Sequence, residues 1–181
     1  VRAMEEAHPE WRRTQPFRAA LEGDMETLAA LGKPAVAQII AATHAEMTSE
    51  EFRRTVRAWI ESARHPQTGR AYTEMVFQPM IELLAFLRAS GFRTYIVSGG
   101  GVEFMRVFAE EVYGVPREQV IGTTIATSFE MTGEGPVIRR LPEVDFVDDG
   151  AGKPAAIDRI IGRRPILAAG NSDGDLQMLQ W

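Results

Sequence analysis

The feature that most constrains the fold is a short apolar run, residues 94–101, that ends in a serine and three glycines. Its β-branched and aromatic side chains and its glycine boundary are typical of a buried strand. Apolar residues at helical spacing over 102–113 predict a helix directly afterwards. Ser98 would then lie at the carboxyl end of a strand, where open α/β sheets bind ligands. Gly99 and Gly100 would present backbone N–H groups to an anion, unless the stretch is only a strand–turn–helix connection.

The rest of the chain divides into a helical part and an alternating part. Residues 1–72 show helical spacing and no convincing strand, and the loop at 65–72 is the expected boundary. From residue 73 to 181 strands and helices alternate, which predicts an α/β fold with a Rossmann-like, mostly parallel sheet flanked by helices. The expected strands after the first lie at 119–122, at 125–131 and 137–141 as a hairpin, at 144–147 and at 165–169.

An oxygen-rich loop, residues 170–175, follows the last of these expected strands. Asn171, Asp173 and Asp175 could each offer oxygen to a hard cation such as Mg²⁺. Asn and Asp are also favoured as helix caps, so the loop could simply begin a helix. A calcium loop is a poorer match, because that motif needs a glycine where this chain has Leu176.

Lys153 stands at the start of a predicted helix, just before Pro154. A lysine there is normally a solvated charge that contributes little to stability, and the helix dipole slightly disfavours it. This mild conflict with local preference hints at another role. On this reading, replacing Lys153 should damage turnover more than folding.

Composition excludes several classes of protein. The chain has 181 residues, a net charge of −5 and no cysteine. Disulfides, zinc–thiolate sites and a cysteine nucleophile are excluded, and the acidic balance argues against a nucleic-acid binder. No apolar run approaches the roughly 20 residues that span a bilayer, so no membrane partner is expected. The cytosol and the periplasm are equally compatible, and the oligomeric state is left open.

Taken in order, three of these places resemble the haloacid dehalogenase superfamily of phosphohydrolases, closest to its phosphoserine-phosphatase-like branch with a helical cap. Residues 96–100 resemble the second motif, whose Ser98 would bind the phosphoryl group with Gly99 and Gly100. Lys153 resembles the third-motif lysine, which steadies the phosphate and the nucleophile. Residues 170–175 resemble the fourth motif, a magnesium loop. The resemblance covers 73–181, with 1–72 as the cap, and implies an enzyme with a small phosphorylated substrate.

Two departures from the family pattern stand out. The first motif, an apolar strand ending in Asp-x-Asp that supplies the nucleophile, has no counterpart. Asp24 lies in helical surroundings and Asp148-Asp149 falls after the second motif. We therefore expect the sequence to be part of a longer chain with the nucleophile upstream, and residues 1–181 alone to be inactive and poorly folded. Asn171 stands where the family commonly has an aspartate, which shifts the expected metal ligation toward Asp175 or Asp173.

The resemblance implies a magnesium-dependent phosphatase that acts through an aspartyl-phosphate. The alternatives are a phosphotransferase or dehalogenase of the same superfamily, or a non-catalytic binding module. The substrate cannot be named from the sequence. His44, Phe77 and Gln78 could face the site, although ordinary packing or surface positions account for them equally well.

Overall fold

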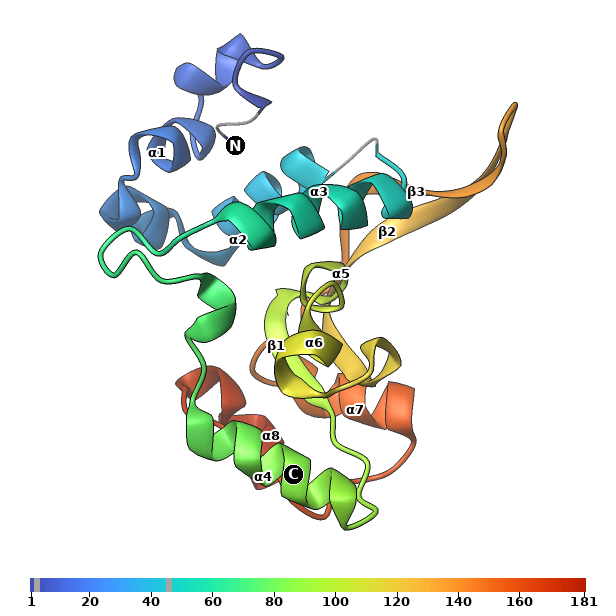
Figure 1. The fold of residues 1–181 in the computed structure, drawn as a ribbon. Helices are drawn as coiled ribbons and strands as arrows, with labels where there is room; N and C mark the ends of the chain where they lie inside the picture. Colours follow the sequence, from blue (N-terminus) through green and yellow to red (C-terminus); the bar gives the residue numbers. More distant parts are fainter. Residues whose placement is uncertain (2–3, 45–46) are drawn as a thin grey trace. The chain divides into compact units, whose positions relative to one another are not determined.

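The computed structural model describes residues 1, 4–44 and 47–181, without the side chains of Lys33, Ala37 and His44. It is drawn in Figure 1. The chain divides into two units: unit 1 comprises 1–48 and 125–144, and unit 2 comprises 49–124 and 145–181. The division into a cap over 1–72 and a core over 73–181 stays a prediction, because the two compact units do not show which segment covers a site.

Unit 1 is built on short helices around stacked aromatic rings. Trp11 and Phe17 are both buried, and their ring centroids lie 4.5 Å apart. The elements of unit 1 are η2 (Pro9–Arg12), α1 (Phe17–Glu22), α2 (Met25–His44) and the outer part of a hairpin made by β2 (Val120–Thr132) and β3 (Gly135–Phe146). Gly32 has a φ of 72° and interrupts α2, because glycine adopts this left-handed conformation readily.

Unit 2 holds the parallel part of the sheet and most of the helices. β1 pairs with β2 in parallel, and the strand order is β1-β2-β3. The predicted hairpin is confirmed, with 133–134 as its turn. Its elements are α3 (Ser49–Ser62), η3 (Tyr72–Glu74), α4 (Gln78–Ala89), β1 (Ile96–Gly101), α5 (Val102–Met105), α6 (Ala109–Tyr113), η4 (Arg117–Gln119), the inner ends of β2 and β3, α7 (Gly152–Ile161), η5 (Asp173–Asp175) and α8 (Leu176–Gln180).

Helices cover both faces of the β1–β2 pair, because successive strand residues point to opposite sides. Ile96 and Val120 pack on one face against residues of α5 and α6. Val97 and Ile121 pack on the other against residues of α7 and α8. This arrangement confirms the predicted α/β class, and the first residues of β1 are held between the two layers of helices.

The helix predicted over 102–113 is in fact two short helices. α5 ends at Met105 and α6 begins at Ala109, with a cap at Phe108 that is not helical. A helix of one turn has few aligned peptide dipoles, so α5 adds little dipole stabilisation to an anion at Gly99 and Gly100.

The prediction of a strand over 165–169 is wrong. No strand is assigned there, and Ile166 and Leu167 are 85% and 61% exposed. An apolar run becomes a strand only when a neighbour pairs its backbone groups, and the described sheet, β1-β2-β3, has no strand beside this run. Among the described residues, no helix combines the length and apolarity needed to cross a bilayer.

Candidate active site

The glycines after Ser98 form a bulge at the end of β1. Ser98 is paired with Gly122 and Gly101 with Thr123, so Gly99 and Gly100 are extra residues with no partner on β2. Both are exposed. The Gly100 N–H donates to Ser98 Oγ at 3.1 Å. A serine hydroxyl has one donor and two acceptor positions, so Ser98 can still donate its O–H to an oxygen placed at the bulge.

Thr123 holds this bulge in place. Its buried hydroxyl donates to the Gly99 carbonyl oxygen at 2.7 Å and accepts the Asp148 N–H at 3.1 Å. One side chain on β2 therefore connects the bulge with the segment that leads into α7. The sequence analysis missed Thr123, because nothing marks a threonine inside a strand as a bridge between two loops.

Lys153 is buried and not solvated, which corrects the expectation for a lysine at a helix start. It is 5% exposed, and its Nζ donates to the Val97 carbonyl oxygen at 2.7 Å. Nζ also forms an ion pair with Asp175 Oδ1 at 2.8 Å. An ammonium group has three donors, so one N–H remains for a bound anion. Lys153 thereby joins the end of β1 to the acidic loop.

Asp175 organises the acidic loop through both carboxylate oxygens. While Oδ1 pairs with Lys153, Oδ2 accepts the Asn171 N–H at 3.0 Å and, from Ser172, the backbone N–H at 3.1 Å and the hydroxyl at 3.0 Å. The hydrogen bond from Lys153 is the largest cause of a lowered pKa at Asp175, and the Asn171 and Ser172 donors add to it against the opposing effect of burial. A Cβ at Gly170 would lie 2.5 Å from the Asp175 Cβ, so only glycine fits there.

The acidic loop still has oxygen atoms that could coordinate a magnesium ion. Both oxygens of Asp175 are engaged, whereas the side chains of Asn171 and Asp173 are exposed. Within the described ranges, no three His, Cys, Asp or Glu side chains gather into a metal cluster. Magnesium commonly binds proteins through one or two ligands and keeps several waters. The donors present fit such a sparse site, and the assignment of its ligands stays a prediction.

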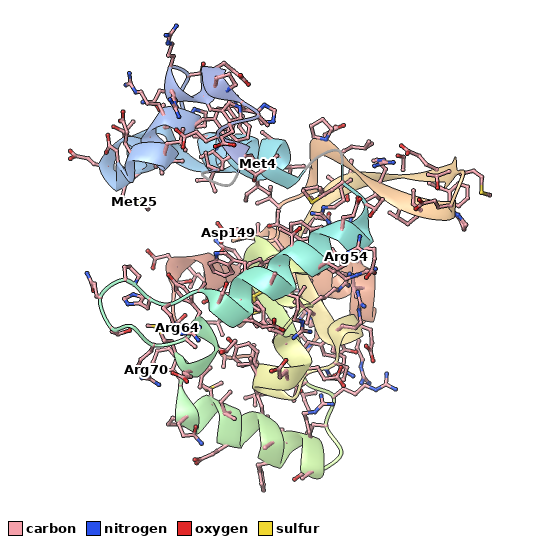
Figure 2. The ribbon with its side chains drawn as sticks, turned by 45° about the horizontal axis from the view of Figure 1, so that its top comes forward. Met4, Met25, Arg54, Arg64, Arg70 and Asp149 are labelled. Carbon is pink, nitrogen blue, oxygen red and sulfur yellow. The ribbon has the colours of Figure 1, made fainter. Side chains whose placement is uncertain are left out.

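Two further carboxylates, Asp148 and Asp149, lie beside the site. Asp149 approaches Gly99: a Cβ there would be 3.7 Å from Asp149 Oδ1. The same oxygen lies against Gly174, and Gly150 donates to the Gly174 carbonyl at 3.0 Å. Asp149, labelled in Figure 2, therefore neighbours both the bulge and the acidic loop. The sequence signal was present, because Asp148 and Asp149 follow the apolar pair 146–147.

Asp148 carries a carboxyl group that is buried away from water. It is fully buried, and neither of its oxygens has a hydrogen-bond partner of good geometry in the described part of the chain. Loss of hydration raises its pKa to about 6, against smaller lowering effects from the Lys153 charge and the nearby Ser98 N–H. A buried carboxyl without partners is costly to ionise, so Asp148 holds its proton to higher pH than an ordinary aspartate.

The predicted phosphate-binding residues are thus connected by neighbouring positions and direct contacts within unit 2. Ser98 follows Val97, whose carbonyl binds Lys153, and Lys153 binds Asp175. Of the residues considered for substrate contact, Phe77 is 73% exposed and Gln78 donates to Glu82 at 3.1 Å. The side chain of His44 lies outside the described residues.

Comparisons with known proteins bear on the fold and the family of this chain. A structure titled a conserved functionally unknown protein, from Anaerococcus prevotii DSM 20548, is 23% identical with a TM-score of 0.56 over 75% of this chain and 41% of its own. A phosphoserine phosphohydrolase-like protein from Francisella tularensis subsp. tularensis SCHU S4 is 19% identical, with a TM-score of 0.41 over 71% of this chain and 53% of its own.

This chain therefore spans about half or less of the length of those two proteins. Among curated proteins, none matches it. The first of the two structures shows a shared fold, and the second is too dissimilar to support more. The sequence model described as haloacid dehalogenase-like hydrolase matches residues 3–180. As the motifs around Ser98, Lys153 and Asp175 predicted, the chain belongs to the haloacid dehalogenase-like hydrolase family.

Proposed function

We propose that the protein is a magnesium-dependent phosphatase whose phosphoryl group binds between the glycine bulge and Lys153. The observation that carries this proposal is the buried lysine, which contacts the Val97 carbonyl and Asp175 at once. A buried ammonium with a donor to spare, beside an exposed glycine bulge, is suited to bind an anion through fixed charge. The chain's membership of the haloacid dehalogenase-like hydrolase family supports the proposal that such a site serves a hydrolase.

The chain's own residues would bind and orient the phosphoryl group. Ser98 would donate its hydroxyl to one phosphoryl oxygen while still accepting the Gly100 N–H. The third donor of Lys153 would contact a second oxygen, and Asp175 would hold the lysine in place. Thr123 would keep the bulge rigid through Gly99. These groups need little reorganisation during the reaction, which is the main source of electrostatic catalysis.

In the proposed reaction, a carboxylate oxygen of an aspartate outside residues 1–181 attacks phosphorus. The bond to the leaving oxygen breaks, and that oxygen takes up a proton. Water then attacks the aspartyl-phosphate, releasing inorganic phosphate and restoring the carboxylate. When bound near Asn171 and Asp173, magnesium would neutralise charge on the phosphoryl oxygens.

The proposal is tested with the complete protein and a generic aryl phosphate. We expect phosphate release that requires Mg²⁺, stops in EDTA and returns when Mg²⁺ is restored. Mass spectrometry of the quenched enzyme should find a phosphorylated aspartate outside residues 1–181. A matched control is Arg93→Gln, since Arg93 is exposed and makes no hydrogen bond or ion pair among the described residues.

Each alternative has its own outcome in this experiment. Full turnover in EDTA would defeat the metal assignment, and phosphate appearing on an added alcohol in place of water would indicate a phosphotransferase. Halide release from a haloacid would indicate a dehalogenase. Vanadate binding without any turnover would identify a non-catalytic binding module. A phosphorylated Asp149 would show that the nucleophile lies within this chain.

A further inference from the structure

Apart from Lys153, several arginine side chains gather in unit 2, on α3 and from α5 to η4. A surface hollow of about 480 Å³ opens there. This volume is within the usual range for small-molecule sites. Five arginines and two glutamates dominate its walls. The lining residues are Glu50, Arg53, Arg54, Arg57, Ala58, Glu61, Arg106, Val107 and Arg117.

Three of the arginines are fixed by partners of their own. Arg53 donates to Glu50 at 2.6 Å, and Arg57 donates to Glu111 at 2.9 Å and to the Val107 carbonyl at 2.6 Å. Arg106 donates to Glu103 at 2.6 Å and to the Arg117 carbonyl at 3.0 Å. Their carboxylate partners bring the local charge close to balance, so these three form a rigid frame.

The other two arginines keep unused donors. Arg54 makes no hydrogen bond or ion pair among the described residues, and it is exposed on α3 (Figure 2). Arg117 is 3.7 Å from Glu103, beyond hydrogen-bond distance, and its guanidinium donates to no described residue. Glu103 Oε2 is itself buried without a hydrogen-bond partner in the described part of the chain. The guanidinium N–H groups of Arg54 and Arg117 are therefore available to a ligand at this hollow.

We propose that this hollow is a second anion site that binds a small molecule carrying one or two phosphate groups. The planar fork of a guanidinium matches phosphate oxygens with two parallel hydrogen bonds. Arg54 and Arg117 supply the contacts, and the paired side chains of Arg53, Arg57 and Arg106 line the same hollow. This site is separate from the Ser98–Lys153 site in its residues and does not depend on the proposed phosphatase function.

The test measures pyrophosphate binding to the complete protein by calorimetry, at low salt and in EDTA. Arg54→Gln and Arg117→Gln should each weaken binding about tenfold, the scale of one charge-assisted hydrogen bond. Arg54→Lys should fall in between, because it keeps the charge and loses the fork. Arg93→Gln is the matched exposed arginine outside the hollow and should bind as the wild type. Ser98→Ala removes the other candidate phosphate contact, so comparing it with Arg54→Gln tells the two sites apart.

The opposite pattern would overturn the proposal. Loss of binding in Ser98→Ala with retention in Arg54→Gln would assign the pyrophosphate to the bulge after β1. No binding of pyrophosphate to the wild type would also reject the site. If a polyglutamate peptide or an oligonucleotide bound through Arg54 while pyrophosphate did not, the arginines would belong to a macromolecular interface. Circular dichroism melts of each variant confirm that a change in affinity is not a loss of folding.

Discussion

Two apolar runs of this chain look alike in sequence and differ in structure. The run at 94–98 contributes residues 96–98 to β1, which pairs with β2 and packs the partly buried Val97 against α7 and α8. The run at 165–169 forms no strand and leaves Ile166 and Leu167 exposed. Apolar content shows that a run tends to be buried, whereas pairing depends on a neighbour that the run itself does not specify. The comparison teaches that local composition predicts a strand only conditionally.

The loops that follow the two runs are nevertheless both ordered by hydrogen bonds. The bulge after β1 is held by Thr123, and the acidic loop is held by Asp175. Lys153 connects the two sides through a buried side chain. Side-chain hydrogen bonds therefore position both loops, although only the first loop follows a paired strand.

The largest effect is expected when Lys153 is replaced, because this separates the two sides. Lys153→Met leaves Asp175 as a buried charge without its ion-pair partner. Breaking a buried pair in this way costs about 3–5 kcal/mol of the free energy of unfolding, and phosphatase turnover should be lost with it. Urea unfolding of the complete protein measures the first effect, and aryl phosphate hydrolysis the second.

A double variant, Lys153→Met with Asp175→Asn, provides the control. It removes both charges together, so it should be less destabilised than the sum of the single variants. If Lys153→Met unfolded like the wild type, Lys153 would be a solvated lysine, as its place at a helix start first indicated.

The next largest effect concerns the polar end of the first run. Ser98→Ala removes the acceptor of the Gly100 N–H and the proposed donor to phosphate. We expect kcat/KM to fall roughly ten- to a hundredfold, the scale of a hydrogen bond to a charged group. Steady-state kinetics with an aryl phosphate gives this value, and unchanged kinetics would remove Ser98 from the site.

The buried carboxyl group of Asp148 predicts that the free energy of unfolding depends on pH. Its pKa is raised in the folded state to about 6, so folding favours the protonated form. The folded protein binds more protons than the unfolded chain between about pH 4 and 6, and stability must fall as pH rises through that window. The loss is on the order of 3 kcal/mol.

Asp148→Asn should remove this loss, so the variant should gain stability relative to the wild type at pH 7.5 and not at pH 4. Urea unfolding at both pH values measures the difference. Asp158→Asn is the control, because Asp158 is an exposed carboxylate on the nearby helix α7. A wild-type protein whose stability, relative to Asp148→Asn, did not change with pH would show that the carboxyl is hydrated or paired.

The smallest effects compare the two apolar runs directly. Val97→Ala should cost about 1–2 kcal/mol, because Val97 is partly buried and packs against the core of α7 and α8. Ile166→Ala should cost less than about 0.5 kcal/mol, since Ile166 is 85% exposed. Thermal melts of both variants in the complete protein measure the contrast. Equal losses would mean that Ile166 is buried there, and the difference between the runs would disappear.

Much of the fold could be predicted because its signals are local. The glycines after Ser98 and the hairpin turn at 133–134 each depend on backbone preferences of one or a few residues. Hydrophobic alternation also gave the α/β class correctly. The motifs around Ser98, Lys153 and 170–175 indicated the family for the same reason, since motif residues are close together in the sequence.

The contacts of the site could not be predicted, because they join residues far apart in the chain. Lys153 reaches Val97 across 56 positions, and Thr123 reaches Gly99 across 24. A sequence pattern specifies which groups are present, but burial and partners depend on how the segments pack. The sequence by itself therefore determined the fold class, the family and the groups that offer chemistry. Only the tertiary structure decided that Lys153 is buried and paired, that Asp148 is isolated and that 165–169 is not a strand, because each depends on distant neighbours that pair or desolvate it.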